Sequence, residues 1–255
     1  MIIVLSPAKR LDFTEPVPRL SVTQPEFQGE TETLIELLKS YTPRRLRNLM
    51  NISADLAALN HERFADWHSP FTSDNAKPAV LAFKGDVYLG LQAETYTKPD
   101  LNWAQKHLRI LSGLHGVLRP LDLMQPYRLE MGTGLKNPRG KNLYDFWGDR
   151  VTDALNDALS KQRSKLLVNL ASKEYFGVVQ PERLAGKLID VTFKDQKNGK
   201  YKIISFFAKK ARGTMASYIV KNRVSDLEGL TGFNDDGYYY VPDQSSEREL
   251  VFYRD

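Results

Sequence analysis

The chain has 255 residues, with 36 Lys and Arg, 31 Asp and Glu, and a net charge of +5. It contains no cysteine, which excludes disulfides and thiolate metal sites and favours a reducing compartment. No linker, repeat or low-complexity tract divides the chain, so we expect a single domain over residues 1–255.

The N-terminal segment is an apolar run over residues 2–5 that predicts a short buried strand. This run is far too short for a signal peptide or a membrane span, so we expect a cytoplasmic protein with no membrane contact. Residues 14–28, which include Pro16, Pro18 and Pro25, predict an extended connection.

A helical insert is predicted over residues 29–66. Thr33 and Glu36 have the spacing of a capping box, and Thr42-Pro43 restarts a helix with Thr42 as its N-cap. A third helix is predicted to begin near Ala54 after a break at Asn51.

The junction between the last two of these helices resembles the helix-hairpin-helix pattern, L-x-x-L-P-G-I-G-x-x-x-A, with Leu46 and Ala57 at its ends. That motif binds DNA phosphates through backbone N–H groups. Asn51 and Ser53 stand where the pattern has glycines; Asn tolerates left-handed angles and Ser can cap a helix. An ordinary helical hairpin remains the alternative, but the adjacent basic residues favour DNA: Arg44, Arg45 and Arg47.

Further elements are predicted along the rest of the chain. Strands are expected at residues 79–83, 108–111, 166–170, 188–193, 201–207 and 250–253, with a hairpin turn at Asn198-Gly199. Helices are expected from about 87 to 95, after Pro99, from 142 through a face of Trp147, Val151, Ala154 and Ala158, and up to about Asn222. These elements predict a mixed α/β (α+β) fold, with one central, mostly buried sheet flanked by helices and the helix-hairpin-helix-like insert.

The segment Arg109–Glu130 is too rich in large apolar residues for a solvent loop. It predicts an ordered loop that packs on the core and offers charged groups to a pocket. The alternative is a structural crossover whose arginines make ion pairs.

Polar and charged residues follow several predicted strands. In mainly parallel sheets, ligands bind beyond the carboxyl ends of the strands, so we expect Ser6, Lys84, Ser112, Asn169 and Lys209 at one edge of one sheet. This edge would form a basic cleft for phosphate, made by Ser6, Lys9, Lys84, Arg119, Arg128, Lys209, Lys210 and Arg212. Four carboxylates are candidate catalytic groups or partners of the arginines: Asp86, Asp122, Glu130 and Glu174.

Metal and cofactor chemistry find little support in the sequence. Only four histidines are present, and none has convincing metal-ligand spacing with a carboxylate. Neither a Walker A loop nor a dinucleotide fingerprint is present. We therefore expect no dedicated metal site and no cofactor.

Long segments of the chain resemble the YaaA peroxide-stress-resistance family. They are SPAK, LAFKGDVYLGLQAE, LSGLHGVLRPLDLMQPYRLEMG, LYDFWGD, VNLAS-KEYF, KIISFFAKKARG and LTGFNDDGY. The resemblance implies a bacterial cytoplasmic protein of the hydrogen peroxide response, linked to lower free intracellular iron and less oxidative DNA damage. It also implies a helix-hairpin-helix element, a positively charged cleft and binding of duplex DNA. It carries over no catalytic residue.

Two functions therefore compete, and a direct iron-binding protein is a third, less favoured alternative. One is a stress protein that binds double-stranded DNA through phosphates, largely independently of sequence. The other is an enzyme that acts on nucleic acid or a nucleotide in the basic cleft. The sequence leaves the oligomeric state open, with a monomer favoured.

Overall fold

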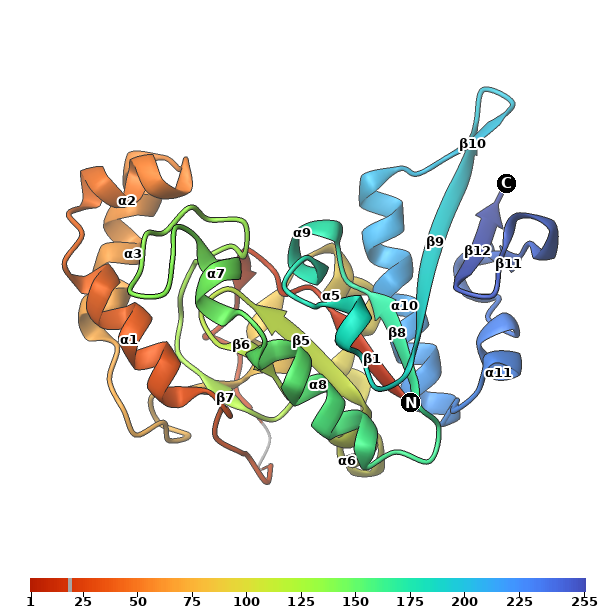
Figure 1. Ribbon diagram of the computed structural model, residues 1–255, viewed down its shortest axis with the longest axis horizontal. Helices are drawn as coiled ribbons and strands as arrows, with labels where there is room; N and C mark the ends of the chain where they lie inside the picture. The colour runs from red at the N-terminus through yellow and green to blue at the C-terminus, as the bar shows by residue number, and fades with distance from the viewer. Residues whose placement is uncertain (18–19) are drawn as a thin grey trace.

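The computed structural model describes residues 1–17 and 20–255 (Figure 1). Pro18, which belongs to the predicted extended connection, lies outside the described residues. The described residues of that connection, 14–17 and 20–27, contain no helix before α1 (Gln28–Lys39), in agreement with the prediction.

One mixed sheet forms the centre of the fold, and the predicted mixed α/β class is confirmed. Its strand order is β11-β12-β9-β8-β1-β5-β6, with β10 paired to β9. The strands β5, β1, β8, β9 and β12 run parallel, and β6, β10 and β11 are antiparallel to their neighbours. The bounds are β1 (Ile2–Leu5), β5 (Leu108–Ser112), β6 (Gly116–Leu118), β8 (Leu166–Leu170), β9 (Lys187–Lys197), β10 (Lys200–Lys202), β11 (Tyr239–Tyr240) and β12 (Glu249–Arg254).

The innermost strand is β1, whose four residues are all fully buried. It pairs with β5 on one side and β8 on the other, with Ile3 opposite both Leu108 and Val168. A strand paired on both edges and covered on both faces is expected to be apolar throughout, which explains the continuous hydrophobic run.

Helices cover both faces of the sheet (Figure 1). The helix α8 (Arg150–Ser160) packs on β1 and β6 in front of the sheet, and α10 (Ser205–Asn222) lies behind it with α5 (Asp86–Leu91) and α6 (Lys98–His107). The other helices are α2 (Pro43–Met50), α3 (Ala54–Asp66), α4 (Ala79–Ala82), α7 (Leu143–Trp147), α9 (Lys173–Phe176) and α11 (Leu227–Thr231). Short 3₁₀ turns are η1 (Ala93–Thr95), η2 (Pro181–Arg183), η3 (Asp235–Gly237) and η4 (Pro242–Gln244).

Two glycines let α5 and α10 pack closely. A Cβ on Gly213 of α10 would overlap the carbonyl oxygen of Val87, and a Cβ on Gly90 of α5 would overlap that of Lys210. Each helix therefore presents a glycine to the backbone of the other. This contact fixes the middle of α10 against α5.

Two predicted strands are wrong. Residues 79–82 form α4, and only Phe83–Lys84 is extended, as β4 paired with β2 (Arg10–Leu11) in a separate two-stranded sheet. A short apolar run does not distinguish a buried strand from a buried helical turn. A second two-stranded sheet joins β3 (Lys77–Pro78) to β7 (Leu123–Met124).

The predicted strand over residues 201–207 ends at Lys202, because α10 already begins at Ser205. The predicted turn is confirmed, since Asn198 and Gly199 have φ of 56° and 72°. The second strand of the hairpin is therefore short, and the apolar residues Phe206 and Phe207 belong to α10.

Two helix boundaries also differ from the prediction. The helix α1 begins at Gln28, so Thr33 lies inside it and donates to the carbonyl oxygen of Gly29 (3.0 Å) instead of capping. The long helix expected from Asn142 is divided into α7 and α8 at Gly148, whose φ is +50°.

A buried histidine follows β5. His115 is fully buried, its Nδ1 lies 3.1 Å from Oγ1 of Thr31, and its Nε2 has no partner within the described residues. Burial lowers the pKa of His115 to about 3. The imidazole is therefore neutral in the folded protein at any pH near neutrality.

This burial predicts acid sensitivity. In the unfolded chain His115 is protonated as the pH falls through 6.5, whereas in the folded chain it stays neutral down to about pH 3. The free energy of unfolding therefore decreases as the pH falls from 6.5 to 3. Between pH 7 and pH 5 the loss from this group is about 2 kcal/mol. Urea unfolding of wild type and of His115→Asn at both pH values measures it. We expect the variant to lose less stability on acidification; an equal loss in both proteins assigns the effect to other groups, such as His107.

Candidate nucleic-acid interface

The helical hairpin α2–α3 has the backbone that the sequence predicts. Thr42 caps α2 by accepting from the N–H of Arg45 (3.3 Å), and Asn51 ends it in the left-handed conformation, with φ 49° and ψ 57°. Ser53 caps α3 by accepting from the N–H of Leu56 (3.3 Å). Asn and Ser therefore take the angles and caps that the two glycine positions of the pattern require.

Apolar residues close the hairpin on the inside. Leu46 of α2 and Ala57 of α3 are buried in the core. The opposite side of α2 consists of polar and basic side chains. The hairpin stands at one end of the molecule in Figure 1, far from β11 and β12.

Three exposed arginines make the outer side of α2 basic: Arg44, Arg45 and Arg47. None of them has a carboxylate within 4.0 Å in residues 1–17 and 20–255. The guanidinium of Arg45 stacks on the ring of Tyr41, 3.6 Å from its centroid. This stacking holds one arginine in place while its charge stays in solvent.

Backbone donors are available at the start of α3. The N–H groups of Ser53, Ala54 and Asp55 find no backbone acceptor in the described structure, as expected for the first turn of a helix. They lie on the same hairpin as the arginines. The carboxylate of Asp55 is also exposed in this turn and would repel a phosphate.

A second cluster lies beyond the carboxyl ends of β1 and β8. Ser6 Oγ accepts from the N–H of Ser172 (2.8 Å) and so joins the two strand ends. Glu130 pairs with both Lys9 (2.7 Å) and Arg128 (2.9 Å). Glu174 accepts from the N–H of Gly132 (3.0 Å), which fixes the end of the Arg109–Glu130 segment next to α9.

Three of the five predicted strand-end residues lie at ends of strands in the central sheet. Ser6, Ser112 and Asn169 lie at the carboxyl ends of three neighbouring parallel strands, as expected. Lys84 and Lys209 do not end strands of this sheet, because Lys84 lies in the separate sheet of β2 and β4 and Lys209 lies within α10. Their segments still lie close to the chain after β1, since a Cβ on Gly85 would lie 3.2 Å from that of Ala8 and Lys209 lies 3.9 Å from Asp86.

Arg119 lies at the opposite edge. It follows β6, which runs antiparallel to β5 with Leu118 opposite Ile110, so it lies near the start of the parallel strands. Its guanidinium donates to the carboxylate of Asp122 (2.8 Å), which is almost fully buried and also accepts from Thr23 Oγ1 (2.5 Å). In this segment Asp122 holds a loop together through its ion pair and hydrogen bonds.

Several cations of the predicted cleft are neutralised by carboxylates. Lys84 lies 3.2 Å from Asp12, and Lys210 lies 3.1 Å from Asp236. Lys209 lies 3.9 Å from Asp86. The half-buried Arg212 has no ion pair in the described part of the chain, and burial lowers its pKa. The surface is therefore more evenly charged than the strand-end pattern indicates.

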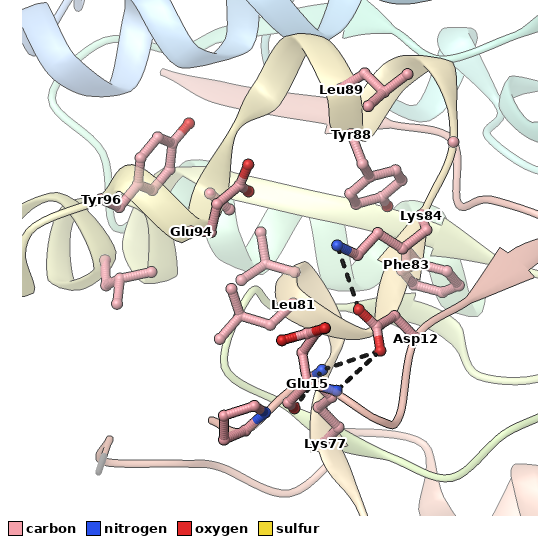
Figure 2. A pocket seen from close by; sticks show the side chains of 15 residues that line it. Asp12, Glu15, Lys77, Leu81, Phe83, Lys84, Tyr88, Leu89, Glu94 and Tyr96 are labelled. Carbon is pink, nitrogen blue, oxygen red and sulfur yellow. Dashed lines mark hydrogen bonds and ion pairs between the residues drawn. The ribbon is translucent and has the colours of Figure 1, made fainter. Parts of the chain in front are cut away.

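A pocket beside these residues was not predicted (Figure 2). Its volume is about 450 Å³, and it has apolar walls that include Leu81, Tyr88 and Leu89. At one end Asp12 Oδ1 accepts the N–H groups of Thr14 (2.9 Å) and Glu15 (3.1 Å), which lowers the pKa of Asp12. The sequence signal for this turn is an Asp followed two residues later by Thr.

The described residues contain neither a cluster of metal ligands nor a membrane-spanning helix. No group of three or more His, Cys, Asp or Glu side chains there could hold a metal ion. Within residues 1–17 and 20–255, none of the helices combines the length and the apolar character needed to cross a bilayer.

The fold and site define a mixed α/β protein with a central mixed sheet and a basic helical hairpin. Residues 1–244 match the family described as "Peroxide stress protein YaaA", and the chain belongs to that family. It is also similar to a UPF0246 protein of Cellvibrio japonicus (strain Ueda107), with 57% identity over 255 residues, which cover 100% of this chain and 99% of that protein.

Proposed function

We propose that this protein binds double-stranded DNA in the peroxide stress response, with the hairpin α2–α3 as its main contact. The observation that carries the proposal is a combination on one hairpin: three exposed arginines and a helix N-terminus whose first N–H groups, like the arginines, have no acidic or backbone partner among the described residues. Arginine and helix N-termini are both strong phosphate ligands.

Contacts of this kind recognise charge and backbone shape and carry no base information. The protein should therefore bind duplexes of different sequence with similar affinity. Binding would shield DNA from oxidants within the protein's cytoplasmic setting. The proposed link to lower free iron is indirect, because the chain has no cysteine and no cluster of metal ligands among the described residues.

The enzymatic alternative rests on the cluster of Lys9, Arg128, Glu130 and Glu174. Here Glu130 is held by two cations and Glu174 by a backbone N–H. Both carboxylates are already engaged by cations or by a backbone N–H, so the cluster favours a structural or binding role over proton transfer.

The test is a titration of fluorescent duplexes by anisotropy over a salt series. We expect binding at low salt, and the logarithm of the binding constant should fall with the logarithm of the salt concentration by about 0.9 for each neutralised phosphate. The affinities of unrelated sequences should differ by less than about threefold. A slope near zero, or a strong preference for one sequence, would refute phosphate-only recognition. Incubation of the same duplexes with Mg²⁺ followed by gel analysis examines the enzymatic alternative, for which cleavage is the expected result.

A further inference from the structure

A basic pocket lies at the edge of the sheet where the parallel strands begin. Its volume is about 430 Å³, within the range of small-molecule sites. The lining comes from the end of α6, the start of β5, the residue after β6 and the end of α8: Gln105, Lys106, His107, Arg109, Arg119, Ala158, Lys161 and Gln162. In Figure 1 these helix ends lie below the sheet, away from the α2–α3 hairpin.

The lining is strongly positive. Four of its residues are Lys or Arg, one is His, two are amides, and none is a carboxylate. Lys106 and Lys161 are exposed and form no ion pair within the described residues. Two carboxylates act on Arg109: Asp122, which is buried and already bonded to Arg119, and Glu26. Four cations against these two carboxylates leave about two positive charges uncompensated.

Arg109 is the innermost of these cations. Its Nη1 donates to the carbonyl oxygens of Gln105 (3.1 Å) and Leu108 (2.8 Å). Its Nε and Nη2, like Nη1 of Arg119, have no acceptor in the part of the chain that the structure describes. Burial, together with the charge of Arg119, lowers the pKa of Arg109 to about 10, against the opposing effects of Asp122 and Glu26.

A guanidinium taken out of water beside a second guanidinium is costly unless an anion completes its hydrogen bonds. Unused N–H groups on two arginines suit the oxygens of a phosphoryl group, which arginine binds in a fork. The two exposed lysines add point charges at the mouth. A single carboxylate would leave part of this charge unmatched, whereas the adjacent phosphoryl groups of a diphosphate would balance it.

We propose that this pocket binds a small anion of the diphosphate class, either as free inorganic diphosphate or as the phosphate tail of a nucleotide. The site is separate from the hairpin that is proposed to bind DNA. Its chemistry is recognition of adjacent phosphoryl groups by Arg109 and Arg119, with Lys106 and Lys161 closing the mouth.

Calorimetry with inorganic pyrophosphate tests the proposal on the full chain. We expect saturable binding with one site per chain, and at least a tenfold loss of affinity in the double variant Lys106→Ala/Lys161→Ala. The matched control is Lys197→Ala/Lys200→Ala, which removes the same charge from the exposed β9–β10 hairpin and should leave the affinity unchanged. The absence of saturable binding by wild type, or an equal loss in the control variant, would overturn the proposal.

Two further experiments use the same proteins. If ATP binds at least tenfold more tightly than pyrophosphate, the ligand is a nucleotide, whereas comparable affinities indicate free diphosphate. Both results support the site. Duplex DNA should bind the Lys106→Ala/Lys161→Ala variant as it binds wild type. If the variant instead loses DNA affinity and pyrophosphate competes with DNA, the pocket is part of the DNA interface and the proposal of a separate site is wrong.

Discussion

Replacing Arg44, Arg45 and Arg47 together by alanine is expected to weaken binding of duplex DNA roughly ten- to hundredfold at low salt, since each exposed charge contact contributes up to about 1 kcal/mol. The loss should be the same for all sequences. Because three phosphate contacts disappear, the log–log salt slope should fall by up to about 2.7. Fluorescence anisotropy across a salt series measures both quantities.

The fold should survive this change, because all three side chains are exposed. Arg45 also packs on Tyr41, so a thermal melt of the variant must accompany the titration. The control is Lys197→Ala/Lys200→Ala/Lys202→Ala, with the same change in net charge on another exposed hairpin. If both triple variants lose the same affinity and slope, DNA responds to overall charge and the hairpin has no special role.

Replacing Gly213 by alanine is expected to destabilise the protein by about 3 kcal/mol or more, the upper range for overpacking. A Cβ there would overlap the carbonyl oxygen of Val87, which belongs to backbone and cannot rotate away. The helices α5 and α10 would have to separate. Urea unfolding at neutral pH gives the change in the free energy of unfolding.

The matched control is Gly29→Ala in α1, where a Cβ would meet nothing within 4 Å. This change should be neutral or stabilise by up to roughly 1 kcal/mol, since alanine is the better helix former. Equal effects of the two substitutions would show that the close approach of α5 and α10 does not contribute to stability.

Local signals in the sequence predicted local structure well. The apolar runs of β1 and β8, the Asn198-Gly199 turn, and the capping residues of α2 and α3 depend on a few adjacent residues, and the structure contains each of them. The left-handed backbone of Asn51 is also a local feature, because it depends on the asparagine side chain and on the end of α2.

The arrangement of the cleft depends on topology, which neighbouring residues do not specify. Arg119 follows a strand that runs antiparallel, so it lies at the edge opposite to Ser6. Lys84 pairs with Asp12, and Lys210 pairs with Asp236. Neither pair is close in the sequence, so no local spacing predicts it. The pattern of strand ends therefore predicted too much positive charge at one edge.

The two glycines between α5 and α10 were also missed as a pair, although a glycine inside a predicted helix is a visible signal. Gly90 and Gly213 are separated by more than a hundred residues. Only the packing of α5 against α10 shows that each glycine makes room for the backbone of the other helix.

The most direct measurement of the central proposal is an amide NMR titration of the ¹⁵N-labelled protein with a short duplex at low salt. We expect the largest shifts at the N–H groups of Ser53, Ala54 and Asp55, together with the side-chain signals of the α2 arginines, because phosphate would bond to these donors. Unchanged signals at these positions, with shifts confined to other parts of the surface, would contradict binding of DNA by the hairpin.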